Sequence, residues 1–225
     1  MTTEAGYRTI ATLFCASLLC TGAYAQEPAP DDALDHKALS ETMLTVNANP
    51  ETRAKALRSG HDRAALCAGC HGDTGIGTRE WIPNLAGQNL QYVLDQVIAY
   101  ANRDRQDRIM NTLAERFSDE DIVNLSVYYH NMTPETFEGP APDSPTIKQG
   151  ESLYQRACKL CHGDDGRGAK GYSWLAGQKP EYLRRALKRY RAGEGGRIDP
   201  KMAAYTAKLT DEEIDALAAY VSTMR

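Results

Sequence analysis

The chain has 225 residues, of which 42% are hydrophobic and 25% are charged, and its formal net charge is −4. This length suits one large or two small domains. The weakly acidic balance argues against a partner made of nucleic acid, which requires a strongly basic surface. After residue 25, no segment is apolar enough to span a bilayer. The composition therefore favours globular domains, and we expect no transmembrane segment in the mature chain.

The first 25 residues have the pattern of a secretory signal peptide. One arginine precedes an apolar run over residues 10–19, and small residues then lead to Ala25. The run is about half of the ~20 apolar residues that a membrane span needs. We therefore predict cleavage after Ala25 and export to the periplasm. Cys15 and Cys20 leave with this segment.

The four remaining cysteines lie in two copies of one motif. Each copy places two cysteines three positions apart and a histidine directly after the second. The residues are Cys67, Cys70 and His71 in the first copy and Cys158, Cys161 and His162 in the second. Two disulfides would account for the thiols of an exported chain, but not for the histidines or for the repetition.

Zinc and haem are the two cofactors that such motifs hold. A structural zinc ion typically takes two pairs of thiolate or imidazole ligands that meet at one ion, whereas here each half repeats a complete motif. Two thiols at this spacing can add to the two vinyl groups of a porphyrin while the adjacent imidazole reaches the iron, which is the attachment signal for c-type haem. We therefore predict two covalently bound haem c groups, one in each half.

The segments that follow the two motifs are also repeated, which indicates a duplicated unit of roughly 80 to 90 residues. The matched pairs are "LAGQ" at 85–88 and 175–178, "QYVLDQVIAY" at 91–100 with "EYLRRALKRY" at 181–190, and "FSDEDIVNLSVYYHNM" at 117–132 with "LTDEEIDALAAYVSTM" at 209–224.

Apolar periodicity and capping signals predict helices. Apolar residues recur at three- and four-residue steps over 90–98, and Ser118 with Asp121, and Thr210 with Glu213, resemble capping boxes that open a last helix. The predicted fold class is all-α, with two tandem helical domains that each wrap around one covalently attached haem. The predicted divisions are a signal peptide (1–25), an N-terminal extension (26–50), a first domain (51–133), a Pro-rich linker (134–146) and a second domain (147–225).

Each iron needs a second axial ligand, and each half offers two methionines. Met110 and Met202 lie eight residues before the residue that caps the last helix, whereas Met132 and Met224 lie at the end of that helix. The first pair falls in connections between helices, where a loop can bring sulfur to iron, so we favour it as the ligands. The second pair is predicted to fill the core. His130 is a rival ligand at the first haem only, since the second half has no other histidine than its motif histidine.

The two "CHG" motifs, "PNLAGQ" and "WLAGQ", the two methionine segments, and "SDEDI" and "TDEEI" together resemble the dihaem cytochrome c4 family. That family has two class I cytochrome c domains in tandem, and the resemblance covers about residues 55–225. It implies two cytochrome c-like domains with His71 and His162 as proximal haem ligands and Met110 and Met202 as distal ones.

The resemblance also implies how the proximal histidines are oriented. In the family, a backbone carbonyl before "LAGQ" faces the other nitrogen of the histidine ring. Pro83 supplies this carbonyl in the first half and Ser173 in the second. Trp81, Trp174 and the repeated tyrosines are candidates for hydrogen bonds to the haem propionates.

The function that the resemblance implies is a periplasmic one-electron carrier and not an enzyme. It would accept electrons from a quinol-oxidising complex or a dehydrogenase and pass them to a terminal oxidase or a reductase. Sulfur and nitrogen on the two faces of each iron leave no position for a substrate. The alternatives are the cytochrome subunit of a flavocytochrome or other dehydrogenase and, less favoured, a dihaem enzyme such as a peroxidase, which needs a vacant or displaceable ligand.

The two halves carry opposite charge. Residues 26–146 contain 10 Lys and Arg against 19 Asp and Glu, whereas residues 147–225 contain 15 against 10. We predict that electrons enter and leave through different domains and that the second domain binds the more acidic partner. The alternative is that the opposite charges only reflect two solvated surfaces and do not influence which partner binds to which domain. The residues expected to form the basic surface are Arg184, Arg185, Lys188, Arg189 and Arg191.

Overall fold

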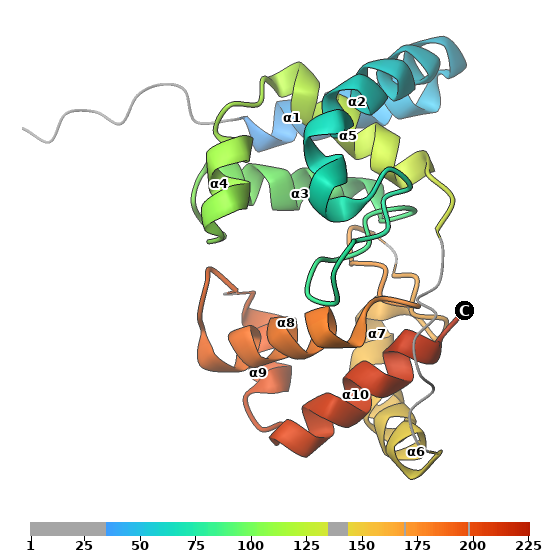
Figure 1. Cartoon of the computed structure of the whole chain (residues 1–225), viewed down its shortest axis with the longest axis vertical. Coiled ribbons are helices and arrows are strands. Elements are labelled where there is room, and N and C mark those ends of the chain that lie inside the picture. Colours follow the sequence, from blue (N-terminus) through green and yellow to red (C-terminus); the bar gives the residue numbers. More distant parts are fainter. Residues whose placement is uncertain (1–34, 135–143, 169, 198) are drawn as a thin grey trace, which may run out of the picture. The chain divides into compact units, whose positions relative to one another are not determined.

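The computed structural model describes residues 35–134, 144–168, 170–197 and 199–225, and its secondary structure there is entirely helical (Figure 1). This confirms the all-α prediction. The described residues belong to one compact unit. None of the helices among them is long and apolar enough to cross a membrane. The predicted signal peptide and most of the predicted linker lie outside the described residues.

The helices from α2 onward recur in the same order in the second half (Figure 1). The first half contains α1 (His36–Ala48), α2 (Pro50–His71), α3 (Leu90–Ala101), α4 (Arg108–Ala114) and α5 (Asp119–Asn131). The second half contains α6 (Ser144–Leu153), the π-helical turn η1 (Tyr154–Cys158), α7 (Lys159–His162), α8 (Pro180–Ala192), α9 (Pro200–Thr206) and α10 (Asp211–Thr223). Helix α6 thus begins inside the last residues of the predicted linker.

Both predicted capping boxes are confirmed. Asp121 N donates to the Ser118 side chain at 3.1 Å, and Ser118 N donates back to the Asp121 carboxylate at 3.1 Å. Thr210 and Glu213 make the same pair of bonds at 2.9 and 3.2 Å. Each box satisfies amide groups that have no partner within the first turn of the helix, so α5 and α10 begin at equivalent places.

A glycine lies where the first and last helices of each half cross. A Cβ atom on Gly60 would meet the backbone carbonyl of Asn124 on α5, and one on Gly150 would meet that of Ala216 on α10. Such close approach of two backbones requires a residue without a side chain. The crossings therefore fix where α2 and the α6–η1–α7 helix lead into the cysteine motifs.

The second half has one residue more than the first between this crossing and the motif. Gly60 to Cys67 is a step of seven positions, whereas Gly150 to Cys158 is a step of eight. Helix α2 runs without interruption, but the second half contains η1 at this place. A π turn closes its hydrogen bond over five residues instead of four. It thereby accommodates the extra residue, and the motif still follows the same crossing.

Helix α1 is part of the core of the first half. Leu39 and Met43 are 5% and 0% exposed, and they join the cluster that contains Leu94, Ile98 and Val123. The predicted N-terminal extension therefore contains a helix that covers the apolar face formed by α3 and α5.

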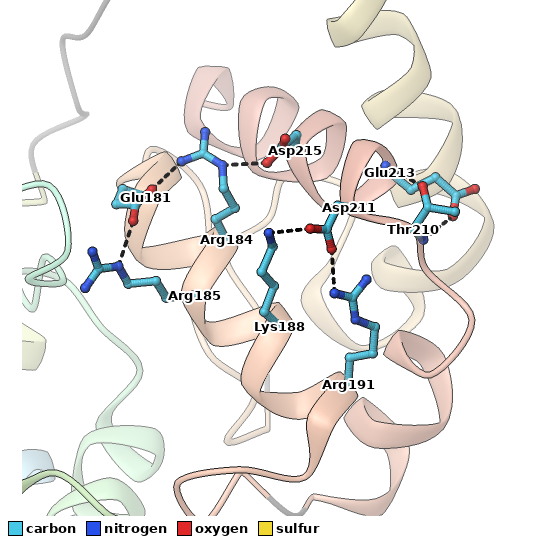
Figure 2. Close-up of polar contacts among 9 residues, drawn as sticks. All are labelled: Glu181, Arg184, Arg185, Lys188, Arg191, Thr210, Asp211, Glu213 and Asp215. Atoms are coloured by element: carbon cyan, nitrogen blue, oxygen red, sulfur yellow. Dashed lines mark hydrogen bonds and ion pairs between the residues drawn. The ribbon is translucent and has the colours of Figure 1, made fainter.

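The corresponding face of the second half is ionic. At the positions that match the α3 and α5 residues just named, α8 and α10 carry Arg184, Lys188 and Asp215. Arg184 Nε donates to Asp215 at 2.6 Å, and Lys188 Nζ donates to Asp211 at 2.8 Å (Figure 2). Charged side chains tolerate exposure to water where apolar ones do not. Among the described residues of the second half, this face accordingly has no helix in the place of α1.

We expect Met43→Ala to lower the free energy of unfolding by about 2–5 kcal/mol, because it leaves a cavity in a packed core. Leu44→Ala, one position along the same helix, is the control, since Leu44 is 54% exposed and its truncation should have little effect. Chemical denaturation of the two haem-loaded variants measures the difference. Equal, small losses would show that α1 does not contribute to the core.

Candidate functional site

The two motif histidines are buried and held in the same way. His71 ends α2 and His162 ends α7, and they are 8% and 7% exposed. His71 Nδ1 lies 3.1 Å from the Pro83 carbonyl oxygen and His162 Nδ1 lies 3.0 Å from that of Ser173. The carbonyl contacts implied by the resemblance are therefore confirmed. Because Nδ1 faces an acceptor, it carries the ring proton and Nε2 keeps its lone pair for a metal ion.

Burial lowers the pKa of both His71 and His162 from the usual value for histidine. The carbonyl hydrogen bonds act in the opposite direction but are outweighed. Both rings are therefore neutral at neutral pH, which is the form that binds a metal ion.

A glycine turn follows each histidine and brings the chain back to it. Gly72 and Gly163 have φ angles of 75° and 82°, which glycine adopts without strain. Each returning loop is then joined to the turn by a backbone hydrogen bond. The bonds run from Leu85 N to Gly75 O and from Leu175 N to Gly166 O, both at 2.7 Å.

The four motif cysteines have free thiols, so they form no disulfide in the described structure. Burial raises the pKa of the Cys67 thiol and raises that of Cys158 to about 11, which keeps both protonated. The described residues contain no group of three or more His, Cys, Asp or Glu placed to hold a metal ion on their own. Each half instead provides two thiols and one neutral imidazole, which is the donor set that covalent attachment of a haem requires.

Met110 and Met202 occupy equivalent places in the first turn of a short helix. The sequence predicts flexible connections here, but the structure has α4 and α9. Asp107 and Asp199 cap these helices, because their carboxylates accept from Met110 N at 3.1 Å and from Met202 N at 2.8 Å. An aspartate at this position favours a helix start. Both methionines are only partly buried.

Met43, Met132 and Met224 are packed within their own halves. A Cβ added to Gly75 would lie 3.2 Å from Met132 Sδ, and one added to Gly166 would lie 3.1 Å from Met224 Sδ. Both sulfur atoms thus fill space against the glycine loops that follow the motifs. Met43 is fully buried in the core cluster with α1.

Two further candidates already have protein partners. His130 Nδ1 lies 3.0 Å from the Gln88 carbonyl oxygen. The indole N–H of Trp174 donates to the Ala176 carbonyl at 3.1 Å, so this tryptophan has no remaining donor for a propionate. Trp81 is 43% exposed, and the guanidinium carbons of Arg79 and Arg185 lie 5.5 and 5.4 Å from the centroid of its ring.

The repeated "LAGQ" glutamines join the two halves by reciprocal hydrogen bonds. The Gln88 amide accepts from Trp174 N at 2.6 Å and donates to Trp174 O at 2.9 Å. The Gln178 amide accepts from Asn84 N at 2.9 Å and donates to Asn84 O at 3.0 Å. Asn84 and Trp174 occupy the same position in the repeat, directly before "LAGQ". Sequence reasoning missed this junction, although the repetition of an otherwise unexplained glutamine was a signal for it.

A second contact joins the loops that precede α4 and α9. Gln106 N donates to the Gly195 carbonyl at 2.9 Å. A Cβ on Gly196 would meet the backbone of Asp104 and Arg105. The loops that lead to Met110 and Met202 therefore touch each other backbone to backbone, so Gly196 has to remain glycine.

The basic residues of α8 are mostly paired with acids of their own half (Figure 2). Arg184 and Arg185 donate to Glu181 at 2.5 and 2.7 Å, and Lys188 and Arg191 donate to Asp211 at 2.8 and 2.5 Å. Four of the five residues predicted to form a basic surface thus have carboxylate partners. This reduces the positive charge that α8 offers to another protein.

The fold and the two motifs define a dihaem c-type cytochrome, with one covalently attached haem in each helical half. The family described as "Cytochrome C oxidase, cbb3-type, subunit III" matches residues 48–128 and again 145–221. A cytochrome c4 of Pseudomonas aeruginosa is 30% identical over 201 residues, which cover 83% of this chain and 98% of that protein. The chain belongs to the cytochrome c4 family of electron-transfer proteins and contains two domains of the matched type.

Two further similarities concern structure and role. The crystal structure of reduced recombinant cytochrome c4 from Pseudomonas stutzeri has a TM-score of 0.69 at 26% identity and covers 75% of this chain and 98% of that chain. A thiosulfate dehydrogenase electron acceptor of Thiomonas intermedia is 29% identical over 171 residues, or 71% of this chain and 78% of that protein. The chain is thus similar both to a solved dihaem cytochrome and to a protein named as an electron acceptor.

We expect Gly196→Ala to weaken the junction of the two halves, because the added methyl group displaces the Asp104 backbone. Gly193→Ala is a matched control, since Gly193 has a similar φ of 67° but nothing within 4 Å of the added atom. Both variants bear the strain of a left-handed residue, about 1–2 kcal/mol. Calorimetry of the haem-loaded variants should show the two halves unfolding separately only in Gly196→Ala. The same thermogram for both variants would contradict this account of the junction.

Proposed function

We propose that this protein is a periplasmic one-electron carrier in which each haem iron is held between a histidine nitrogen and a methionine sulfur. The observation that carries the proposal is the matched pair of anchored histidines, His71 and His162. When bound, each haem supplies reversible exchange of one electron at its iron, and methionine ligation favours a higher potential than bis-histidine ligation does. The protein sets the orientation of the ligands and the burial of the site.

The proposed attachment and ligand residues follow the repeat. Two thiols in each half attach the haem, and the carbonyl groups of Pro83 and Ser173 hold the proximal rings in one orientation. Met110 and Met202 supply the sulfur ligands, and this assignment is supported by the packing of Met43, Met132 and Met224 elsewhere. The attachment residues are Cys67, Cys70, Cys158 and Cys161, and the iron ligands are His71, Met110, His162 and Met202.

The proposed ligand sets favour an electron carrier over an enzyme. A peroxidase-type enzyme needs one iron with a vacant or displaceable position. The two halves of such an enzyme would then differ in the residue that occupies the second ligand position. Here Met110 and Met202 share the same helix position and the same aspartate cap. Both irons are therefore expected to be saturated, and no position remains for a substrate.

The proposed donor is a periplasmic dehydrogenase or a quinol-oxidising complex, and the acceptor is a terminal oxidase or a reductase. Similarity to the Thiomonas intermedia electron acceptor supports a thiosulfate-oxidising enzyme as a donor. A permanent subunit role, as in a flavocytochrome, is the second candidate and would be recognised by a flavoprotein that copurifies. The opposite charges of the two halves support different docking domains for donor and acceptor.

We expect the oxidised protein to show the weak far-red absorption of a sulfur–iron bond. Met110→Ala and Met202→Ala should each diminish this band, and the double variant should abolish it, because each removes one sulfur ligand. Met132→Ala and Met224→Ala are the controls, since both side chains pack against glycine loops. Loss of the band in the control variants instead would transfer the ligand role to Met132 and Met224.

The carrier function predicts rapid reduction of both haems by a thiosulfate dehydrogenase with thiosulfate, followed by rapid reoxidation by a terminal oxidase. Stopped-flow spectroscopy measures both rates. At ~0.1 M salt the screening length is about 10 Å, so the rate with the more acidic partner should fall as salt is raised further. Peroxide turnover by the purified protein, with no electron exchange with either partner, would contradict the proposal.

The docking part of this experiment needs a substitution that spares the ion pairs between α8 and α10. Arg189 is exposed, and the described residues show no ion pair for it. Arg189→Gln should slow the reaction with the acidic partner at low salt and leave the spectra unchanged. Arg116→Gln, an exposed residue of the acidic half, is the control. Equal rates for both variants at every salt concentration would show that charge has no part in docking.

A further inference from the structure

The first cysteine of each motif packs against a cluster that contains a buried tyrosine. Cys67 lies against the cluster that contains Tyr129, which is 4% exposed. Cys158 lies against the cluster that contains Tyr154, which is 0% exposed. Neither tyrosine belongs to the donor set of its motif, so its burial beside a motif cysteine needs an explanation of its own.

The two tyrosines occupy different positions in the repeat. Tyr129 lies on α5, and its counterpart on α10 is Val221. Tyr154 is the first residue of η1 and lies four positions after the glycine at the helix crossing. The residue four positions after the crossing glycine of the first half is Ala64. Each half therefore has a tyrosine at one of these two positions and a smaller residue at the other, in opposite order.

All four residues of this exchange are buried in the two clusters. Ala64 belongs to the cluster of Tyr129 and is 6% exposed, and Val221 belongs to the cluster of Tyr154 and is 5% exposed. Protein interiors are close-packed, so a ring fits beside the motif only where the residue at the other position is smaller. The ring comes from the last helix in the first half and from the helix that leads to the motif in the second.

Each hydroxyl group acts on its own motif. Burial raises the pKa of Tyr129 and that of Tyr154, so both hydroxyls keep their protons and can donate. Tyr154 Oη donates to the Gly163 carbonyl oxygen at 2.6 Å, and Gly163 directly follows His162. Tyr129 acts instead as a hydrogen-bond donor toward Cys67, where it opposes the larger effect of burial on the pKa of that thiol.

The bond from Tyr154 adds to a turn that is otherwise held by the backbone alone. Gly163 O also accepts from Gly166 N, at 3.3 Å. The matching bond of the first half, from Gly75 N to Gly72 O, is 3.1 Å long. In the first half, Ala64 has no hydroxyl that could donate to this turn. The turn after the motif histidine is therefore held by a side chain from the leading helix only in the second half.

We propose that Tyr129 and Tyr154 are positioning residues of the two haem sites, which fill the same place beside the first motif cysteine but act on different atoms. Tyr129 donates to the sulfur by which Cys67 holds the first haem. Tyr154 fixes the turn that sets the ring orientation of His162. The proposal deepens the carrier function and rests on the two covalent haems, but not on the methionine ligands or the redox partners.

The two hydroxyls have different expected effects. A hydrogen bond to a thioether sulfur draws electron density away from the porphyrin and so disfavours the oxidised, more positive iron. Loss of the Tyr129 hydroxyl should therefore lower the reduction potential of the first haem. The orientation of an axial histidine ring decides how unpaired spin is distributed over the porphyrin of the oxidised protein. Loss of the Tyr154 hydroxyl should therefore shift the methyl resonances of the second haem.

The test is a redox titration of the complete dihaem protein, followed by NMR of haem methyl resonances assigned to each half. Tyr129→Phe should lower the potential of the first haem only, and Tyr154→Phe should shift the methyl resonances of the second haem only. Tyr128→Phe and Tyr220→Phe are matched controls, because these partly buried neighbours occupy equivalent positions on α5 and α10. An unaltered signal in either variant, or equal changes in the controls, would overturn the proposal. Failure of the carrier function alone would leave these signals intact, because they require only the bound haems.

A second comparison tests whether the two rings fill the same place. Tyr154→Ala should lower the thermal midpoint of the haem-loaded protein, because it leaves a cavity in a packed core. Val221→Tyr alone should also lower it, because a second ring overfills that core. The two substitutions together recreate the order of the first half, so the double variant should regain most of the midpoint. A double variant no more stable than Tyr154→Ala would contradict the shared place.

Discussion

The reciprocal hydrogen bonding of Gln88 and Gln178 with the backbone of the opposite half is the contact on which the two haem sites depend. The residue that precedes this contact in each half holds the motif histidine. Pro83 holds His71, and the next residue along the chain, Asn84, pairs with Gln178. The same order recurs in the second half. One short loop in each half therefore both orients a motif histidine and joins the halves, so a change at the junction reaches the two motif histidines directly.

The two halves stabilise one fold by different means. The first half buries an apolar face beneath α1, whereas the second exposes the corresponding face and pairs its charges, as between Arg184 and Asp215. The second half also absorbs an extra residue in η1 directly before its motif. The surroundings of the two motifs thus differ although the motif residues are matched. Such differences in burial and charge are what separates the potentials of two otherwise similar haems.

Local patterns in the sequence predicted most of the fold and of the candidate site. The helical periodicity and both capping boxes depend on residues close together in the chain. The carbonyl partners of His71 and His162 followed instead from the resemblance to a known family. The helical start before Met110 was also readable from Asp107, which is a favourable N-cap. The π turn was detectable only by comparing the spacing of the two halves.

What the sequence could not predict arises where distant segments meet. Arg105 and Tyr182 are 77 positions apart, and nothing in either segment reveals that Arg105 Nη2 donates to the Tyr182 hydroxyl. The basic helix α8 illustrates the same limit, because a count of charges does not show that Asp211 and Asp215 lie beside it (Figure 2). Burial and pairing at the junction depend on the assembled fold and not on local propensity.

The most direct test of the account is the intact mass of the protein purified from the periplasm, measured after extraction with acid and organic solvent. Two thioether-linked haems would survive this treatment, so the mass should equal that of the chain from Gln26 plus two haems. The variant with Cys158→Ala and Cys161→Ala should retain one haem, attached in the first half. A wild-type mass with a single haem, or with zinc and no haem, would contradict the claim that each half is built around its own haem.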